Sequence, residues 1–491
     1  MTHNYFIKCP ICGAVTRMRT PVGYVSKTPV RIHCGKCDTL LTGEFLIDNT
    51  KLRIQYVPLN CEEVSPQDFD YFGEASGELL CNKVMELHAE KNEIFNLPLG
   101  KASPVFDFMS SIPEPDRIRF INYVCYSSSL TEQWDTQRIK YDLYLKGKKE
   151  LIIKKYREEA KQFWCQPDSD IGILQFTFRS LFYDLGGLFK RNELEELLRK
   201  INYHFCHLNQ VKLAEYIAEI KQSNRLHIVQ EKIFKIVNDY IGVVPYLIPA
   251  IGVLYYTNAE IVDKNEMGMS TCSFEDIKKF YQDTYESLVD CCDVVVGLDN
   301  IENRGDCNTF TNRLNLDKFR KQSKGNRITF LNDSEYFVGV FNLPISSSSL
   351  RNAIGHSDYE YDGTKQEISY REKNGSDVIL TAFLLDVALE CCKMMRSVCI
   401  LSFMVYELYR YDMHNSNNSL LMHPMMYKWI KSQSRCPCGS GKKYKQCCKP
   451  MIDFLDETVL DMDYPMRAEC DSPSKEEIKK LFSLHQRDDF R

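Results

Sequence analysis

The chain has 491 residues, which corresponds to about three domains of ordinary size. Hydrophobic residues make up 44% and charged residues 26%, a balance that excludes a wholly disordered, collagenous or fibrous chain. The formal net charge of −5, from 62 basic and 67 acidic residues, excludes a generally basic nucleic-acid coat but allows local basic patches.

Cysteine is frequent, with 21 residues. A secreted disulfide scaffold is usually short and carries an even number of cysteines and a leader, whereas residues 1–8 have no basic-then-apolar leader. The longest uncharged apolar run, residues 240–256, is shorter than a spanning helix and contains Pro245 and Pro249. We therefore expect a soluble, cytoplasmic protein with metal-binding cysteines, a buried kinked segment at 240–256 and no membrane contact.

The sequence predicts a mainly α fold with five regions in chain order. These are 1–58, 59–268, 269–414, 430–452 and 453–491. The first contains paired cysteines and β-type segments such as 30–32 and 45–47. The second has the periodicity and composition of helices, and we expect it to be a helical middle domain with a regulatory role. The last two are a second cysteine cluster and a tail with a short helix capped by Ser474 and Glu477.

The third region is predicted in more detail. Ser273 and Asp276 have the spacing of a capping box, which predicts the start of a helix. Polar residues 300–332 predict a loop, and then a short helix, a hairpin turning at Asp362-Gly363 and a long apolar helix over 377–411 follow. Residues 415–418 are predicted to be a linker. The loop carries a basic cluster: Lys318, Arg320, Lys321, Lys324 and Arg327. This cluster fits either RNA phosphate contacts or a solvated surface.

Two CxxC pairs predict the first metal site. Its four thiolates come from Cys9, Cys12, Cys34 and Cys37, with glycines at 13 and 35 that would let backbone amides approach the sulfurs. Four thiolates form a tetrahedral zinc site, and the pattern resembles a zinc ribbon. Zinc binding supplies folding free energy on the order of ten kcal/mol to such small modules. We therefore expect a structural zinc ion here.

The segment 435–449, RCPCGSGKKYKQCCK, predicts a second zinc site. The candidate ligands are Cys436, Cys438, Cys447 and Cys448. This segment closely resembles the SEC-C motif, the small zinc module at the end of the bacterial preprotein translocase motor, although Cys448 stands where that module often has histidine. The surrounding lysines fit either a docking patch for RNA, the ribosome or a protein partner, or a solvated surface.

The segment 351–356, RNAIGH, carries the residues that suggest catalysis. On a helix, Leu350, Ala353 and Ile354 form one apolar face, and the polar residues form the opposite arc. Glycine at 355 costs a helix roughly 1 kcal/mol relative to alanine, and it leaves open space on the polar side. Because the hairpin follows, the helix must end close to His356, where its dipole favours a protonated imidazole. A second Arg/His pair with this spacing, Arg199 and His204, is interpreted as coincidence.

This order of parts resembles the HEPN superfamily, helical bundles with an Arg-polar-x-x-x-His motif, here Arg351, Asn352 and His356. The resemblance spans about 273–411 and includes the hairpin before the last long helix. It implies a metal-independent endoribonuclease whose composite site forms when two copies of the motif face each other. It therefore also implies a homodimer or higher homo-oligomer, RNA as the substrate and no catalytic metal.

The chemistry of these side chains agrees with that expectation. The RNA 2′-hydroxyl is the nucleophile, His356 would be the general acid or base, and Arg351 would hold the phosphate and its transition-state charge. Asn352 would orient the imidazole or the substrate, and an acidic residue within 273–293 is a candidate assistant. The expected products are a 2′,3′-cyclic phosphate and a 5′-hydroxyl. The resemblance to the HEPN superfamily further implies a role as a toxin or anti-phage defence effector.

Other interpretations of the same residues stay open. Most surface Arg/His pairs have no function, and Tyr359 and Tyr361 fit hairpin packing as well as base stacking. The main alternative function is a non-catalytic adaptor whose zinc modules bind RNA, the ribosome or a protein partner. A zinc-ribbon DNA-binding regulator is a weaker alternative, because the sequence contains no evident recognition helix and has a negative net charge.

Overall fold

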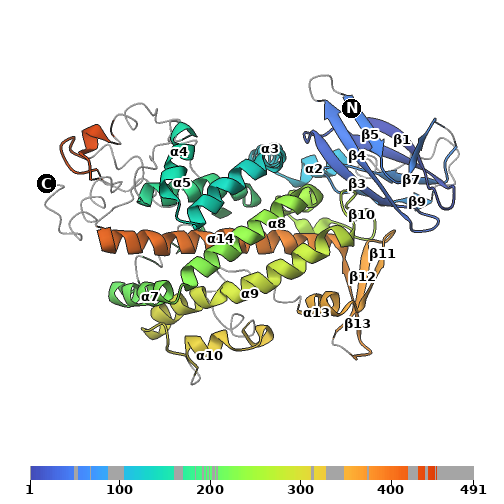
Figure 1. Cartoon of the computed structure of the whole chain (residues 1–491). Coiled ribbons are helices and arrows are strands. Elements are labelled where there is room, and N and C mark those ends of the chain that lie inside the picture. Colours follow the sequence, from blue (N-terminus) through green and yellow to red (C-terminus); the bar gives the residue numbers. More distant parts are fainter. Residues whose placement is uncertain are drawn as a thin grey trace.

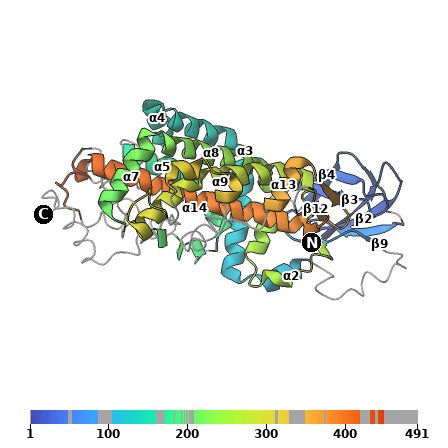
Figure 2. The same cartoon turned by 90° about the horizontal axis from the view of Figure 1, so that it is seen from below.

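The computed structural model of the chain has about 55% helix and several small sheets, which agrees with the mainly α prediction. It describes residues 2–48, 53–66, 68–86, 104–159, 170–182, 184–190, 208–310, 314–327, 348–372, 375–417, 430–436 and 441–447, together with 193–194, 196–197, 200–201, 205 and 449. An elongated helical body has a β-module at one end and residues 430–447 toward the other (Figures 1 and 2).

Residues 2–86 form the β-module, which contains two sheets. The first sheet has the order β6-β1-β2-β7-β9 and is antiparallel except for the parallel pair β2–β7, and the second is the antiparallel sheet β3-β4-β5. The strands are β1 (Thr2–Lys8), β2 (Val15–Pro21), β3 (Lys27–His33), β4 (Leu40–Asp48), β5 (Arg53–Pro58), β6 (Glu62–Val64), β7 (Tyr71–Glu74), β8 (Cys81–Asn82) and β9 (Met85–Glu86). Alternate residues of β3, including Val30 and Ile32, point into the core, as the period of a half-buried strand requires.

The β-module extends beyond the predicted boundary at residue 58. Residues 62–86, predicted to be helical, form strands β6 to β9, and β8 pairs with β10 (Met267–Gly268). These strands are two to four residues long, too short for an alternating pattern to be recognised in the sequence. Their extended form depends on pairing with distant strands.

The helical body contains α-helices of various lengths and short 3-10 helices. They are α2 (Pro104–Ser111), α3 (Glu114–Leu145), α4 (Lys149–Glu159), α5 (Asp170–Phe182), η3 (Asp184–Leu188), α7 (Gln210–Gln222), α8 (Arg225–Leu254), η4 (Ala259–Ile261), α9 (Phe274–Arg304), α10 (Leu316–Arg320), α13 (Ser348–His356) and α14 (Leu384–Asn417). Helices α8, α9 and α14 pack against one another, and α3 packs on α8. One hydrophobic core includes residues from all four helices, so the predicted regions 59–268 and 269–414 share a core.

Helix α8 contains the long apolar run that the sequence analysis singled out. The helix continues through Pro245 and Pro249, and residues from Tyr240 to Val253 are largely buried. It is the one helix among the described residues whose length and composition would suit a membrane span, and 67% of its apolar window is buried inside the protein. Its neighbours α3, α9 and α14 cover it, as expected for a core helix.

Helix α9 begins where the sequence predicted. The backbone N–H of Ser273 donates to the Asp276 carboxylate at 2.8 Å, which forms the predicted capping box. The helix continues to Arg304, so residues 300–304, predicted to be loop, are its last turn. Gly305 follows in the left-handed region with φ 79°, which ends the helix.

The segment after α13 contains one strand more than predicted. Strands β11 (Tyr359–Asp362) and β12 (Glu367–Arg371) form the expected hairpin, and β13 (Ile379–Phe383) adds a third antiparallel strand. The long apolar helix therefore occupies 384–417 instead of 377–411, and it includes residues 415–417 of the predicted linker. Residues 379–383 are apolar enough for either state, and pairing with β12 selects the strand.

We expect Gly297→Ala to lower the free energy of unfolding by about 1–3 kcal/mol, because a Cβ there would overlap the ring of the fully buried Tyr216. Gly242→Ala is the matched control, since it lies on the exposed side of α8 and a Cβ there would have no atom within 4 Å. The control should be neutral or stabilising by up to about 1 kcal/mol. Urea denaturation measures both, and equal stabilities of the two variants would contradict the packing described here.

Candidate active site and metal centres

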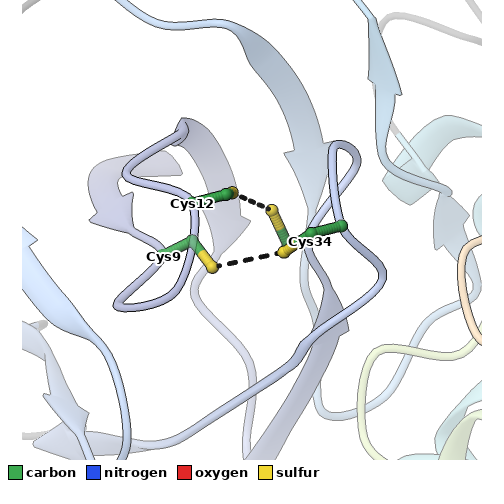
Figure 3. A group of neighbouring side chains, drawn as sticks. Cys9, Cys12 and Cys34 are labelled. Atoms are coloured by element: carbon green, nitrogen blue, oxygen red, sulfur yellow. Dashed lines mark hydrogen bonds between the residues drawn. The ribbon is translucent and has the colours of Figure 1, made fainter.

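The four cysteines of the first predicted metal site converge on one point at the end of the β-module. Their sulfur atoms all lie within 4.8 Å of one another, and Figure 3 shows how the first three lie. The sulfurs of Cys9 and Cys37 are 3.7 Å apart, and those of Cys12 and Cys34 are 3.5 Å apart. Tetrahedral zinc with Zn–S bonds of about 2.3 Å separates its sulfur ligands by about 3.8 Å. The site therefore fits zinc.

Each cysteine pair lies on a tight turn with the same backbone pattern. The N–H of Gly13 donates to the carbonyl of Cys9 at 3.0 Å, and that of Asp38 donates to the carbonyl of Cys34 at 2.9 Å. Both turns end in the left-handed region, with φ 74° at Gly13 and 56° at Asp38. Gly35 also packs against Tyr71, because a Cβ there would overlap the ring of that tyrosine.

The thiols of this site differ in burial. The Thr39 hydroxyl lies 3.1 Å from the Cys37 sulfur and lowers the pKa of this exposed thiol to about 6. Burial raises the pKa of the Cys34 thiol to about 12. A bound cation supplies the positive charge that a buried thiolate requires, so the donor set suits a metal ion better than free thiols.

The second cysteine cluster is described in part. Cys436 is buried and Cys447 is half-buried, whereas Cys438 and Cys448 lie outside the described residues. The Cys436 N–H donates to the carbonyl of Lys442 at 2.7 Å, and the Tyr444 N–H donates to that of Ser434 at 2.8 Å, which closes a compact turn. Cys436 and the 2%-exposed Tyr444 join the main hydrophobic core, so this segment is attached to the helical body. Lys442, Lys443 and Lys445 are exposed.

Helix α13 has the two faces that its sequence predicted. Leu350, Ala353 and Ile354 are buried, whereas Asn352 and His356 are exposed. The helix ends at His356, after which Ser357 adopts φ 55°. The N–H groups of Ser357 and Asp358 donate to the carbonyls of Ile354 and Ala353, at 3.2 and 2.9 Å, which is a Schellman-type end. The structure thus places His356 on the last turn and open to solvent.

Arg351 points toward α9. Its Nε lies 3.1 Å from Oε1 of Glu286, and its guanidinium lies 5.4 Å from the centre of the Tyr285 ring. The charges are close, but Nε makes no well-aligned hydrogen bond. The contact with Glu286 is therefore an ion pair through Nε without an aligned hydrogen bond. Arg351 and His356 are five residues apart, or about 140° around the helix, so one copy of α13 presents them in different directions.

Gly355 faces Gln282 of α9. A Cβ at this position would lie 3.2 Å from the Gln282 amide nitrogen, and no other atom would be within 4 Å. The open space predicted beside Gly355 is therefore bordered by one flexible side chain. Gln282, Tyr285 and Glu286, which all face α13, were not assigned individually from the sequence, because their proximity depends on how α13 packs on α9.

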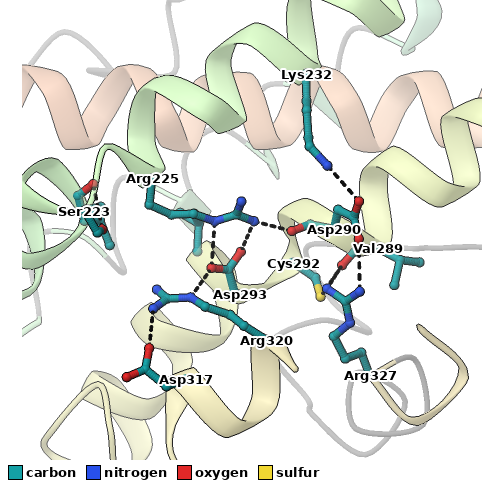
Figure 4. Close-up of polar contacts among 12 residues, drawn as sticks. Ser223, Arg225, Lys232, Val289, Asp290, Cys292, Asp293, Asp317, Arg320 and Arg327 are labelled. Carbon is teal, nitrogen blue, oxygen red and sulfur yellow. Dashed lines mark hydrogen bonds and ion pairs between the residues drawn. The ribbon is translucent and has the colours of Figure 1, made fainter. Parts of the chain in front are cut away.

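Glu286 belongs to a row of carboxylates on one side of α9. The next two members of the row, Asp290 and Asp293, are shown in Figure 4. Asp293 is fully buried and accepts from Arg225 at 2.6 and 2.9 Å and from Arg320 at 2.7 Å. Burial alone would raise the pKa of Asp290, but Lys232 and neighbouring cations hold it below its usual range. Glu286, Asp290 and Asp293 are spaced four and three residues apart, which places them on the same face of a helix. This spacing makes the row recognisable in the sequence.

This row binds most of the basic cluster that was a candidate for RNA contact. Arg320 pairs with Asp293, Arg327 donates to Asp290 at 2.9 Å, and Lys324 pairs with Glu286. Lys318 and Lys321 are exposed. Three of the five cations thus hold α10 and the segment after it against α9, which leaves Lys318 and Lys321 as the members of the cluster that could contact phosphate.

The two hairpin tyrosines pack within the protein. The Tyr359 ring meets that of Phe274 edge-on with centroids 5.1 Å apart, and its hydroxyl accepts from Lys278 at 2.7 Å. Tyr361 packs between Phe274 and His33, and burial raises its pKa well above the usual range. The second Arg/His pair, Arg199 and His204, and the tail 453–491 lie outside the described residues.

Comparison with known proteins identifies one segment of this chain. The family model of the SEC-C motif matches residues 434–450. Residues 434–450 form a SEC-C motif. The motif is a zinc-binding module, which confirms the assignment of the second cysteine cluster and its metal type. No curated protein and no solved structure matches the chain.

We expect the purified protein to carry two zinc ions per chain and Cys34→Ser to lose one of them, because Cys34 is the most buried ligand of the first site. Inductively coupled plasma mass spectrometry measures the metal content. Cys125→Ser, an exposed cysteine outside both clusters, is the control and should retain both ions. An unchanged zinc content in Cys34→Ser would exclude the first site.

We also expect Asp293→Asn to lower the free energy of unfolding by about 3 kcal/mol, since it leaves two half-buried guanidinium groups without their shared carboxylate. Asp317 also pairs with Arg320, but its carboxylate is exposed. Asp317→Asn should therefore lower the free energy of unfolding by less than about 1 kcal/mol. Thermal and urea unfolding of both variants give the comparison. A similar small loss for both would show that the buried pair is not important for stability.

Proposed function

We propose that this protein is a metal-independent endoribonuclease of the HEPN type that acts in the cytoplasm as a toxin or anti-phage defence effector. The observation that supports this most directly is the arrangement of α13. The helix exposes Asn352 and His356 to solvent, and Arg351 is held on α9 by Glu286 and Tyr285. An imidazole that a polynucleotide can reach and a guanidinium with a fixed orientation are the groups the reaction requires.

RNA contains its own nucleophile, so the protein has to move protons and stabilise charge. His356 takes the proton of the 2′-hydroxyl or gives one to the leaving 5′-oxygen, which contributes about 10²- to 10⁴-fold in rate. Arg351 binds the phosphoryl oxygens with the guanidinium nitrogens that do not contact Glu286. Asn352 orients the imidazole or the substrate. The bond between phosphorus and the 5′-oxygen breaks, and a 2′,3′-cyclic phosphate and a 5′-hydroxyl remain.

A second copy of the chain completes this site. Because Arg351 and His356 point about 140° apart on one helix, an acid and a base on opposite sides of a phosphate are supplied best by two helices. Gly355 favours such an approach, since only Gln282 borders the space beside it. The proposed assembly is a homodimer or a higher homo-oligomer with two α13 helices facing each other. Both zinc ions are structural in this proposal.

The second candidate function is a non-catalytic adaptor that binds RNA, the ribosome or a protein partner. Its support is the SEC-C motif at 434–450, where Lys442, Lys443 and Lys445 are exposed on a small module attached to the end of the helical body. The paired state of Arg320, Lys324 and Arg327 counts against a broad RNA-binding surface next to α13. The two functions differ in whether RNA is turned over.

We expect His356→Ala to reduce cleavage of labelled total RNA by at least about 100-fold, because it removes the proposed acid or base. The assay contains excess EDTA, the zinc content is measured before and after, and the product ends are identified. His227→Ala, a half-exposed histidine on α8, is the matched control and should cleave as wild type does.

Full activity of His356→Ala would contradict the proposed mechanism. If neither protein cleaves RNA although both bind it, the adaptor is favoured. Because a nuclease that requires an activator would also be silent in this assay, induction in cells is the companion test. Growth arrest by the wild type but not by His356→Ala supports the nuclease.

A further inference from the structure

The first metal site touches the hairpin that follows α13. The N–H of Gly363, at the tip of the β11–β12 hairpin, donates to Oδ2 of Asp38 at 3.2 Å. Asp38 immediately follows the ligand Cys37, and its Oδ1 lies 3.1 Å from Nδ1 of His33. The His33 ring covers Gly363 so closely that a Cβ there would overlap it. Gly363 has no positive φ, so this close approach is what requires glycine.

Strand β3, which ends at His33, also contacts the start of α9. The Arg31 side chain lies 3.3 Å from Asp276, the carboxylate that caps α9, and the Arg31 N–H donates to the carbonyl of Ser270 at 2.8 Å. Arg31 and His33 are on the same side of β3, two residues apart. One strand therefore contacts both the helix on which α13 packs and the hairpin to which α13 is joined (Figure 1).

Only two residues separate His356 from that hairpin. Asp358 donates its N–H to Ala353 of α13 at 2.9 Å, and its carboxylate lies 3.4 Å from Nε of Arg371 on β12. At this end of α13, residues 355–357 are exposed, and the next residues along the chain that contact the protein are Asp358 and those of the hairpin. Its position therefore depends on where the hairpin is held.

We propose that the turn 34–38 of the first metal site positions the β11–β12 hairpin, and through it His356, with His33 and Asp38 as the positioning residues. The proposal rests on the proposed function for the role of His356. A zinc ion bound to Cys34 and Cys37 would stabilise the turn between them in addition to the core of the β-module. Such an ion would act on the site only by helping to place two side chains, and it would take no part in the reaction.

The test is Gly363→Ala in the full chain. The added methyl group must push the hairpin away from the His33 ring, while the thiolates and α13 remain unaltered. We expect an unchanged zinc content, about tenfold faster hydrogen exchange in peptides covering 351–371, and unchanged exchange in α8. We also expect a kcat for RNA cleavage at least about tenfold lower, with a smaller change in KM, because positioning is lost and binding is not. Gly325→Ala, where a Cβ would have no atom within 4 Å, is the matched control.

A second variant separates this contact from general damage. His33→Ala removes the ring that covers Gly363, so adding Gly363→Ala to His33→Ala should cause little further change in exchange or kcat. Unchanged exchange at 351–371 in Gly363→Ala would overturn the proposal, and so would faster exchange with an unchanged kcat. Equal effects of Gly363→Ala in both backgrounds would also overturn it. If the wild type neither cleaves RNA nor arrests growth on induction in cells, but exchange responds as expected, the nuclease function fails and the positioning contact stands.

Discussion

Helix α9 packs its apolar stripe between α8 and α14, and it turns its carboxylates toward α10 and α13. The apolar contacts make the helical body one unit, since the core they form is continuous from α3 to α14. The carboxylates of α9 position α10, the segment after it and α13. Asp293 pairs with Arg320 of α10, Asp290 pairs with Arg327 in the segment after α10, and Glu286 contacts Arg351 of α13. Without α9, neither the body nor the orientation of α13 would be defined.

Both cysteine clusters are small modules attached to this body. The first is joined to it through Arg31, His33 and Asp38, and the second through Cys436 and Tyr444, which reach the main core. A zinc ion in such a module acts by fixing a short turn whose side chains can then make specific contacts. In the first module these contacts reach the hairpin next to His356, which links a candidate zinc site to a candidate catalytic residue.

The sequence predicted features whose physical cause lies within a few residues. The capping box at Ser273, the amphipathic face of α13 and its end at His356 were all predicted, because each depends on local hydrogen bonds or on a helical period. The strands within 62–86 and at 379–383 were missed because pairing with other strands, near or far in the sequence, decides their conformation. The ion pairs of the basic cluster were not predicted for a similar reason, since three of its five charges pair with carboxylates 27, 37 and 38 residues away.

The sequence by itself brought together the four cysteines of the first site, because thiolate chemistry and short spacings leave few alternatives, and it located the SEC-C segment and placed the Arg351–His356 motif on a short helix. Only the tertiary structure decided what surrounds that motif. Glu286, Tyr285 and Gln282 approach it because α13 packs on α9, and Asp38 meets Gly363 although 325 positions separate them. Such contacts arise from packing and hydrogen bonding between surfaces that are complementary in three dimensions. The local periodicity of the sequence therefore does not predict them.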